Sequence, residues 1–134
     1  MIRGSCLCGA VRYAISTPLE EMHHCHCSRC RKAHGAAFST FARVEEKDLE
    51  LLSGKDKVRD FQSSAPVKRS FCADCGSQLF FRFAPLPEAA WVAVGTFDDD
   101  PDVRPQGHIF ATSKAPWHDI TDSLPQYEGY PPQD

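Results

Sequence analysis

Seven cysteines in three close clusters constrain this chain of 134 residues more than any other feature of its sequence. The clusters are Cys6 and Cys8, then Cys25, Cys27 and Cys30, then Cys72 and Cys75. An odd number of cysteines cannot pair completely into disulfides, and no charged and then apolar leader segment opens the chain. Close cysteine spacings without a signal for export indicate metal binding before disulfide bonding. We expect zinc, because thiolates bind it strongly and four of them complete a tetrahedron.

The spacing of the cysteines also indicates which of them share a metal ion. Cys72-x-x-Cys75 followed by Gly76 is typical of half a zinc knuckle, which needs two thiolates from another segment. The first cluster offers two thiols, so the first and third clusters together predict one closed structural site. The middle cluster of three then holds a second zinc ion with one open coordination position. A different partition, in which the middle cluster takes Cys6 or Cys8 as a fourth ligand, stays open because spacing alone rarely settles shared ligands.

The composition predicts a single zinc-binding domain over residues 1–134, with a Pro-rich tail at 127–134. A hydrophobic content of 42% is enough for a modest core, which bound zinc supplements. The formal net charge of −3 argues against nucleic-acid binding, which needs a basic surface. Because no apolar stretch approaches the roughly 20 residues that span a bilayer, we expect no membrane partner. A cytoplasmic protein is expected, or a nuclear one in a eukaryote.

Short alternating runs of apolar and polar residues predict a mainly β fold of antiparallel hairpins pinned by zinc, with little helix. The predicted strands are residues 10–15, 38–44, 49–52, 58–61, 67–72, 79–83, 91–97 and 108–110. A hairpin turn is expected at residues 53–56, and a second hairpin carries the third cysteine cluster at its tip. One short helical turn is predicted over residues 28–34, with Ser28 as its N-cap.

Three sequence motifs, each containing one cysteine cluster, together resemble a known family. They are Gly4-Ser-Cys6-Leu-Cys8-Gly9, Cys25-His-Cys27-Ser-Arg-Cys30 and Phe71-Cys72-Ala-Asp-Cys75-Gly76. In this order, the motifs resemble the glutathione-dependent formaldehyde-activating enzyme family, which also includes centromere protein V, from Arg3 to about Gln126. The resemblance implies a β-tent fold with two zinc ions, a structural one on the first and third motifs and a catalytic one on the middle motif. It also implies condensation of glutathione with formaldehyde to S-hydroxymethylglutathione, which in reverse is a carbon–sulfur lyase reaction.

The middle cluster is the predicted catalytic site. A zinc ion held by the thiolates of Cys25, Cys27 and Cys30 keeps a fourth position for an incoming thiol, which coordination converts to a thiolate at neutral pH. Adduct formation then needs proximity between that sulfur and a carbonyl carbon. His34 follows the cluster by four residues and is the best candidate for proton transfer, because its unperturbed pKa is near neutral. The alternative is that His34 is an ordinary surface histidine.

Five further residues are candidates for binding the substrate. Arg29, Arg31 and Lys32 stand beside the middle cluster and could hold the carboxylates of a thiol peptide such as glutathione. The alternative is that they balance the thiolate charge or face solvent. Lys114 and Trp117 belong to a segment that resembles shorter members of the family, and both are candidates for a pocket wall. The alternative for Trp117 is a place in the core.

The remaining histidines and phenylalanines near these motifs receive no catalytic role. Alternation along an extended segment points His26 away from the metal ion that its two neighbours bind. His23 or His24 could reach the fourth coordination position, but ligation there would close the catalytic opening. Five phenylalanines are assigned to the core and the pocket lining: Phe38, Phe41, Phe80, Phe81 and Phe83.

The sequence therefore predicts a zinc-dependent carbon–sulfur lyase or thiol-adduct enzyme. Its predicted partners are a small thiol such as glutathione and a small aldehyde such as formaldehyde, and the oligomeric state is left open. Two alternatives come from other functional classes. One is a non-catalytic binding module stabilised by zinc. The other is a thiol redox sensor, in which the middle cluster loses zinc and forms a disulfide.

Overall fold

The computed structural model describes residues 1–132; the last two residues of the predicted Pro-rich tail, 133 and 134, lie outside the described residues. Within residues 1–132 the chain is mainly β, with one α-helix. The strands are β1 (Ile2–Ser5), β2 (Arg12–Ile15), β3 (Met22–Cys25), β4 (Ser39–Glu45), β5 (Leu49–Ser53), β6 (Val58–Ser64), β7 (Val67–Cys72), β8 (Gln78–Phe83), β9 (Ala89–Ala93) and β10 (His108–Ile109). The helix is α1 (Ser28–His34), and short 3₁₀ turns are η1 (Glu46–Asp48), η2 (Lys55–Lys57), η3 (Val94–Thr96) and η4 (Ala111–Ser113). The predicted fold class is confirmed.

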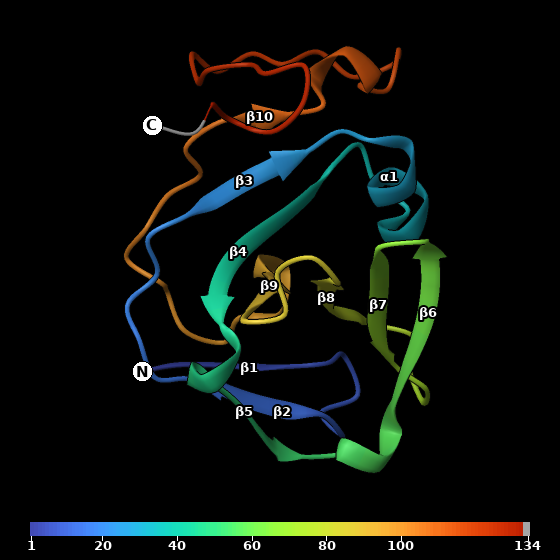
Figure 1. The fold of residues 1–134 in the computed structure, drawn as a ribbon, viewed down its shortest axis with the longest axis vertical. Coiled ribbons are helices and arrows are strands. Elements are labelled where there is room, and N and C mark those ends of the chain that lie inside the picture. Colours follow the sequence, from blue (N-terminus) through green and yellow to red (C-terminus); the bar gives the residue numbers. More distant parts are fainter. Residues whose placement is uncertain (133–134) are drawn as a thin grey trace.

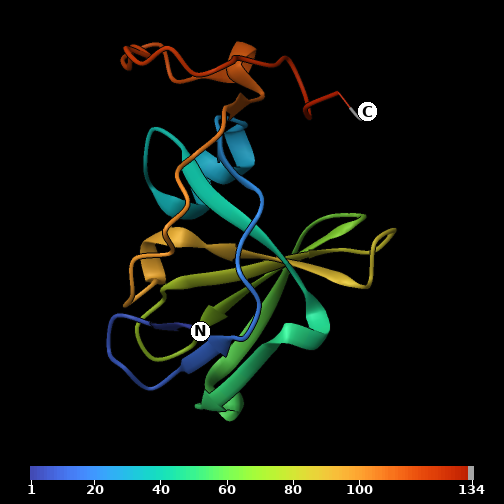
Figure 2. The ribbon, with the colours of Figure 1, turned by 90° about the vertical axis from the view of Figure 1, so that its left-hand side faces the viewer.

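The strands form two sheets. The smaller sheet has the order β1-β2-β5, and the larger has the order β10-β3-β4-β9-β8-β7-β6. Their neighbours pair antiparallel, apart from β10, which pairs in parallel with β3. Figure 1 shows the smaller sheet at one end of the molecule and the segment that follows β10 at the other end, beyond β3. Figure 2 shows the same separation from the side. In the described part of the chain, no helix is long and apolar enough to cross a membrane.

The main core joins the smaller sheet to one face of the larger sheet. Tyr13 and Ile15 of β2 are fully buried in it, together with Phe80 of β8 and Val92 of β9. The ring of Tyr13 packs edge-on against that of Phe80, with 5.2 Å between the ring centroids. Because successive side chains of a strand point to opposite faces, the residues next to these in sequence lie on the other face of the larger sheet. That other face is therefore available for a second cluster of side chains.

The predicted hairpin at residues 53–56 is wrong. Strand β5 pairs with β2 in the smaller sheet, whereas β6 pairs with β7 in the larger one, so the chain passes from one sheet to the other between them. Gly54 turns the chain there with a φ of 76°, and a Cβ at this position would overlap the carbonyl oxygen of Ala10. A Gly-containing turn between two apolar runs fits both a hairpin and a crossing between sheets, so the local pattern could not separate them.

Two element boundaries also differ from the prediction. Cys27, not Ser28, is the N-cap of α1, because its sulfur accepts a hydrogen bond from the backbone N–H of Cys30. The strand predicted at residues 91–97 is β9, which ends at Ala93 and continues as the 3₁₀ turn η3. The hairpin of β7 and β8, with the third cysteine cluster in its turn, is confirmed. Strands β1 and β3 were not predicted.

Candidate metal centres and their cavity

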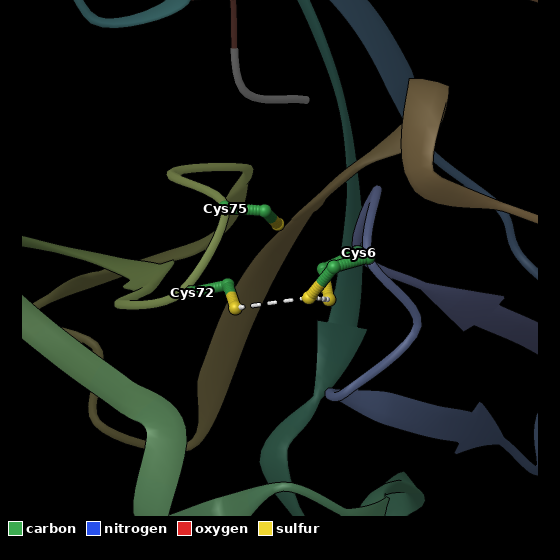
Figure 3. A group of neighbouring side chains, drawn as sticks. Cys6, Cys72 and Cys75 are labelled. Atoms are coloured by element: carbon green, nitrogen blue, oxygen red, sulfur yellow. Dashed lines mark hydrogen bonds between the residues drawn. The ribbon is translucent and has the colours of Figure 1, made fainter.

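Four cysteine sulfurs meet between the two sheets. Cys6 and Cys8 follow β1, whereas Cys72 ends β7 and Cys75 lies in the turn before β8. The four sulfurs lie within 4.8 Å of one another. Figure 3 shows the side chains of Cys6, Cys72 and Cys75 converging on one space.

The geometry of this four-cysteine centre suits zinc. The Sγ atom of Cys8 is 3.6 Å from that of Cys6 and 3.9 Å from that of Cys72. Tetrahedral zinc with bonds of about 2.3 Å to sulfur separates its ligands by about 3.8 Å. The donor set therefore fits a closed zinc site, in which protein sulfurs fill all the coordination positions.

A glycine follows each cysteine pair and shapes the turn that presents its sulfurs. Gly9 has a φ of 79° and donates its N–H to the carbonyl oxygen of Cys6 at 3.1 Å. Gly76 has a φ of 77° and donates to the carbonyl oxygen of Cys72 at 2.7 Å. L-residues with a Cβ rarely adopt this left-handed backbone, so these glycines permit two similar tight turns that face each other.

The other three cysteines form a second centre where β3 passes into α1. Cys25 ends β3, Cys27 caps the helix and Cys30 lies in its first turn, with all three sulfurs within 4.8 Å of one another. Hydrogen bonds from the thiols of Cys25 and Cys30 lower the pKa of Cys27, so the first thiolate forms there. Three neighbouring thiolates repel one another unless a cation lies between them. This three-cysteine centre can therefore hold a metal ion, consistent with zinc, and leaves one position of a tetrahedron to a non-protein ligand.

A cavity of about 240 Å³ opens beside the three-cysteine centre. The three cysteines line it on one side, and it reaches across the second face of the larger sheet. Its charged lining residues are three arginines and one glutamate, Arg29, Arg43, Arg69 and Glu21. The surplus of guanidinium groups favours an anionic ligand.

The floor of the cavity is a row of four side chains on neighbouring strands. In the sheet register, Arg69 lies opposite Phe81, Phe81 opposite Trp91, and Trp91 opposite Arg43. The rings of Phe81 and Trp91 stack with 4.9 Å between centroids and 4° between planes. The guanidinium of Arg69 lies 5.7 Å from the centroid of Phe81, and that of Arg43 lies 5.9 Å from that of Trp91. We call this row the Arg–Phe–Trp–Arg ladder; it offers an apolar surface with a cation at each end.

The segment after β10 forms another wall of the cavity. Phe110 and Tyr130 line the cavity and pack edge-on with 5.2 Å between their centroids. Burial raises the pKa of Tyr130, and the nearby thiolates of the three-cysteine centre raise it further. The phenol is therefore a neutral wall beside the sulfurs.

A chain of hydrogen bonds through two buried histidines connects the same segment to the three-cysteine centre. The Nε2 atom of His26 lies 2.8 Å from Nδ1 of His108, and Nε2 of His108 lies 2.9 Å from a carboxylate oxygen of Asp122. An ionised Asp122 accepts a hydrogen bond from Nε2–H of His108, so Nδ1 of His108 accepts one from Nε2–H of His26. His26, which lies between Cys25 and Cys27 in the sequence, is fully buried in this network.

Most of the sequence matches the model of one protein family. The profile of the glutathione-dependent formaldehyde-activating enzymes matches residues 1–113, which include all seven cysteines and the complete Arg–Phe–Trp–Arg ladder. The chain belongs to this family. The family assignment made from the three cysteine motifs is thereby confirmed.

Individual relatives of this glutathione-dependent formaldehyde-activating family show how far the likeness extends. A protein of Halomonas elongata is 28% identical over 98% of this chain and 89% of its own length. A protein of Phaeosphaeria nodorum is 32% identical over 81% of this chain but only 58% of its own length. Both are provisionally named as glutathione-dependent formaldehyde-activating enzymes. The chain spans 41% of a similarly named Aspergillus flavus protein, so several relatives are much longer.

A solved structure supports the fold of this family member. The crystal structure of a Rhodobacter sphaeroides protein superposes with a TM-score of 0.62 and 27% sequence identity. The likeness covers 77% of this chain and 91% of the other. The mainly β arrangement of the two sheets is therefore shared with an experimentally observed protein.

The three basic residues predicted to bind the substrate, which lie beside the three-cysteine centre in the sequence, have different surroundings. Arg29 lines the cavity. The Nε atom of Arg31 donates instead to the carbonyl oxygen of His26 at 3.3 Å, which supports the backbone of the three-cysteine centre. Lys32 is exposed and lies along a neighbouring hollow that it shares with Phe61 and Arg69. Among them, Arg29 is the residue placed to meet a ligand in the cavity.

The other predicted site residues, His34, Lys114 and Trp117, do not line the cavity. His34 lines a separate hollow with Ser39, and burial lowers its pKa to about 4. The Nζ atom of Lys114 donates to the carbonyl oxygen of His118 at 2.9 Å. Trp117 is 72% exposed, so it is not a core anchor. The binding and catalytic roles assigned to these residues stay predictions.

The phenylalanines divide between the two faces of the larger sheet. Phe41, Phe81 and Phe83 line the cavity, and Phe80 lies in the main core. Phe38 packs 4.5 Å from the ring of His24 by centroid distance. The sequence analysis missed the arginines of the ladder and the aromatic wall after β10. Alternation along β7 and β8 could have placed Arg69 and Phe81 on one face, but only the register brings them together.

Proposed function

We propose that this protein is a zinc-dependent thiol-adduct enzyme that joins glutathione, or a similar small thiol, to formaldehyde or another small aldehyde. In the direction of cleavage this reaction is that of a carbon–sulfur lyase. The observation that carries the proposal is the three-cysteine centre in the wall of a cavity with cationic and aromatic lining. Membership of the glutathione-dependent formaldehyde-activating family supports the choice of substrates.

Each centre has a different role in the proposal. The four-cysteine centre stabilises the fold, because its sulfurs come from distant segments and fill the coordination sphere. The three-cysteine centre is catalytic, and zinc bound there supplies an open position that holds the substrate thiol as a thiolate at neutral pH. Cys25, Cys27 and Cys30 hold that centre at one end of the cavity. The cavity then keeps the aldehyde near the sulfur, which raises the effective concentration of the two reactants.

The cavity lining accounts for the proposed thiol. Arg29 is exposed to solvent and Arg43 is partly exposed, and both can donate charge-assisted hydrogen bonds to the carboxylates of a thiol peptide. The stacked rings of Phe81 and Trp91 provide a flat apolar surface for its backbone. A small anionic thiol therefore matches the site better than a neutral one.

The proposal is tested by metal stoichiometry and adduct exchange in one set of samples. Native mass spectrometry should show two zinc ions per chain and an added glutathione on the two-zinc species. NMR exchange spectroscopy should show faster interconversion of glutathione and S-hydroxymethylglutathione than occurs without protein. The matched control is Cys30→Ser, which should retain one zinc ion and lose the acceleration. A single zinc ion that does not respond to glutathione, with no acceleration, would contradict the proposal and favour a binding module or redox sensor.

A further inference from the structure

We propose that Arg69 donates a hydrogen bond to the carbonyl oxygen of the aldehyde and stabilises the negative charge that develops there. The inference rests on the proposed function and adds a catalytic residue that the cysteine motifs do not contain. Arg69 belongs to β7, lines the cavity and touches a sulfur of the three-cysteine centre. The buried cation of Arg69 therefore lies beside the sulfurs at which, in the proposed function, the thiol meets the aldehyde.

The hydrogen bonds of Arg69 leave part of its guanidinium without a partner. Only 7% of the residue is exposed. Its Nη2 atom donates to Sγ of Cys30 at 3.6 Å, and its Nε atom donates to Oγ of Ser63 at 3.1 Å. Its Nη1 atom is buried and has no partner among residues 1–132. Leaving a buried N–H unpaired is unfavourable, so Nη1 is a free donor for a group that the protein itself does not supply.

Compensation of the thiolate charge accounts for the contact made by Nη2 of Arg69, but not for the position of Nη1. The contact with Cys30 uses Nη2, and the planar fork of arginine presents Nη1 beside it. A lysine could compensate the same charge with one nitrogen. The second arm fits an additional oxygen close to the sulfurs, which is where the aldehyde must bind for bond formation.

The position of Arg69 in the ladder separates its role from that of Arg43. The backbones of the two residues are three strand spacings apart in the sheet, roughly 14 Å in total. Arg69 contacts the three-cysteine centre, whereas Arg43 stands at the opposite end of the aromatic floor. Remote carboxylates of the thiol therefore match Arg43, and the reacting oxygen matches Arg69.

The chemistry of addition creates a need for such a donor. The substrate thiolate forms a bond from sulfur to the carbonyl carbon, and the π electron pair of the carbonyl moves to its oxygen. That oxygen then takes a proton from water, which replaces the proton that the thiol released to solvent. No oxidation or reduction occurs. The oxygen carries negative charge only after bond formation begins, so the donor lowers the barrier more than it stabilises the bound substrates.

The decisive variants are Arg69→Gln and Arg69→Lys, with Arg82→Gln as the matched control. Arg82 also lies over a phenylalanine ring, 5.6 Å from the centroid of Phe80, but it is paired with Glu46 at 2.8 Å. We expect Arg69→Gln to reduce the catalysed exchange of glutathione with formaldehyde about 100-fold. The zinc stoichiometry and the dissociation constant for glutathione should stay within threefold of the parent. Arg82→Gln should leave all three quantities unchanged.

The outcomes separate this inference from the proposed function. If Arg69→Gln keeps the parental exchange rate with two zinc ions, the inference is overturned and the proposed function stands. If the parent itself does not accelerate exchange, the proposed function fails and the inference fails with it. Should Arg69→Gln lose zinc, Arg69→Lys decides, because it retains positive charge beside Cys30 without the second arm. A rate at least tenfold below the parent then supports the inference, and an unchanged rate overturns it.

Discussion

The two cysteine centres differ in how far apart their ligands lie in the sequence and in what surrounds them. The four-cysteine centre joins segments that are 64 residues apart, with Cys6 and Cys72 packed into the main core. The three-cysteine centre comes from one segment of six residues, between Cys25 and Cys30, and faces a cavity. In the proposed function, a metal ion held by the first arrangement resists unfolding, because a link between distant segments restricts the unfolded chain. The second contributes little to chain connectivity and is free to bind and release a ligand.

The surroundings of the two centres sharpen this contrast. Cys72 has no exposed surface, and in the described residues no guanidinium donates a hydrogen bond to the four sulfurs of its centre. Cys30 receives a hydrogen bond from Arg69, a buried cation. A complete set of sulfurs needs no further ligand, whereas three sulfurs beside a cation and a cavity have room for one. The number of sulfur ligands and the surrounding residues therefore support the different roles proposed for the two centres.

The largest expected effect comes from breaking the four-cysteine centre. We expect Cys72→Ser to abolish cooperative thermal unfolding or to cause aggregation, because apparent binding energies of structural zinc are on the order of 10 kcal/mol in small domains. The measurement is the melting transition followed by circular dichroism, together with zinc per chain. A variant that melts like the parent would show that this centre does not stabilise the fold.

The corresponding change in the other centre should separate activity from stability. Cys30→Ser is expected to bind one zinc ion, to retain cooperative unfolding and to lose at least 100-fold in catalysed adduct exchange. The reason is that the three-cysteine centre lies within one short segment, so the loss of its metal ion breaks no link between distant strands. Native mass spectrometry and NMR exchange measure the two effects on one sample. Two bound zinc ions with parental activity would refute the role assigned to the three-cysteine centre.

The different origins of the two centres explain what sequence analysis could predict. The grouping of Cys25, Cys27 and Cys30 follows from spacing, because a strand end and one helical turn bring them together locally. The hairpin of β7 and β8 also has a local signal in its apolar runs and its cysteine turn. The passage from β5 to β6 could not be predicted in this way, since pairing with β2 and β7 depends on residues far away in the sequence.

The cavity was less accessible to sequence analysis than the metal centres. Its ladder depends on the register of four strands, and a shift by one residue would move each side chain to the opposite face. Arg69 therefore gives no signal in the sequence that separates it from an exposed strand arginine. Arg29, Arg31 and Lys32 were chosen for nearness in sequence, yet only Arg29 among them lines the described cavity. Nearness along the chain predicts ligands of a local metal centre better than the walls of a pocket.

A moderate effect is expected at the far end of the ladder from the three-cysteine centre. Arg43→Gln should raise KM for glutathione roughly tenfold, because it removes a charge-assisted hydrogen bond to a carboxylate from a partly exposed site. The KM for the neutral thiol 2-mercaptoethanol should change less than twofold, and kcat should be retained. Arg59→Gln is the matched control, since Arg59 is exposed on β6 and donates to backbone carbonyls. Equal changes for both thiols would contradict carboxylate recognition by Arg43.

The smallest effect is expected at His34, the candidate for proton transfer. Its ring packs edge-on against Phe41, with 5.3 Å between centroids, and it lines a hollow separate from the cavity. Burial, followed by the positive charge of Arg69, lowers its pKa to about 4, so the imidazole is neutral at pH 7. We expect His34→Gln to change the exchange rate less than threefold and to leave its pH profile between pH 6 and 8 unaltered. A residue that transfers a proton in the reaction would instead contribute about 10² to 10⁴ in rate. A loss of that size with both zinc ions bound would make His34 catalytic, and would require the hollow it lines to connect with the cavity during turnover.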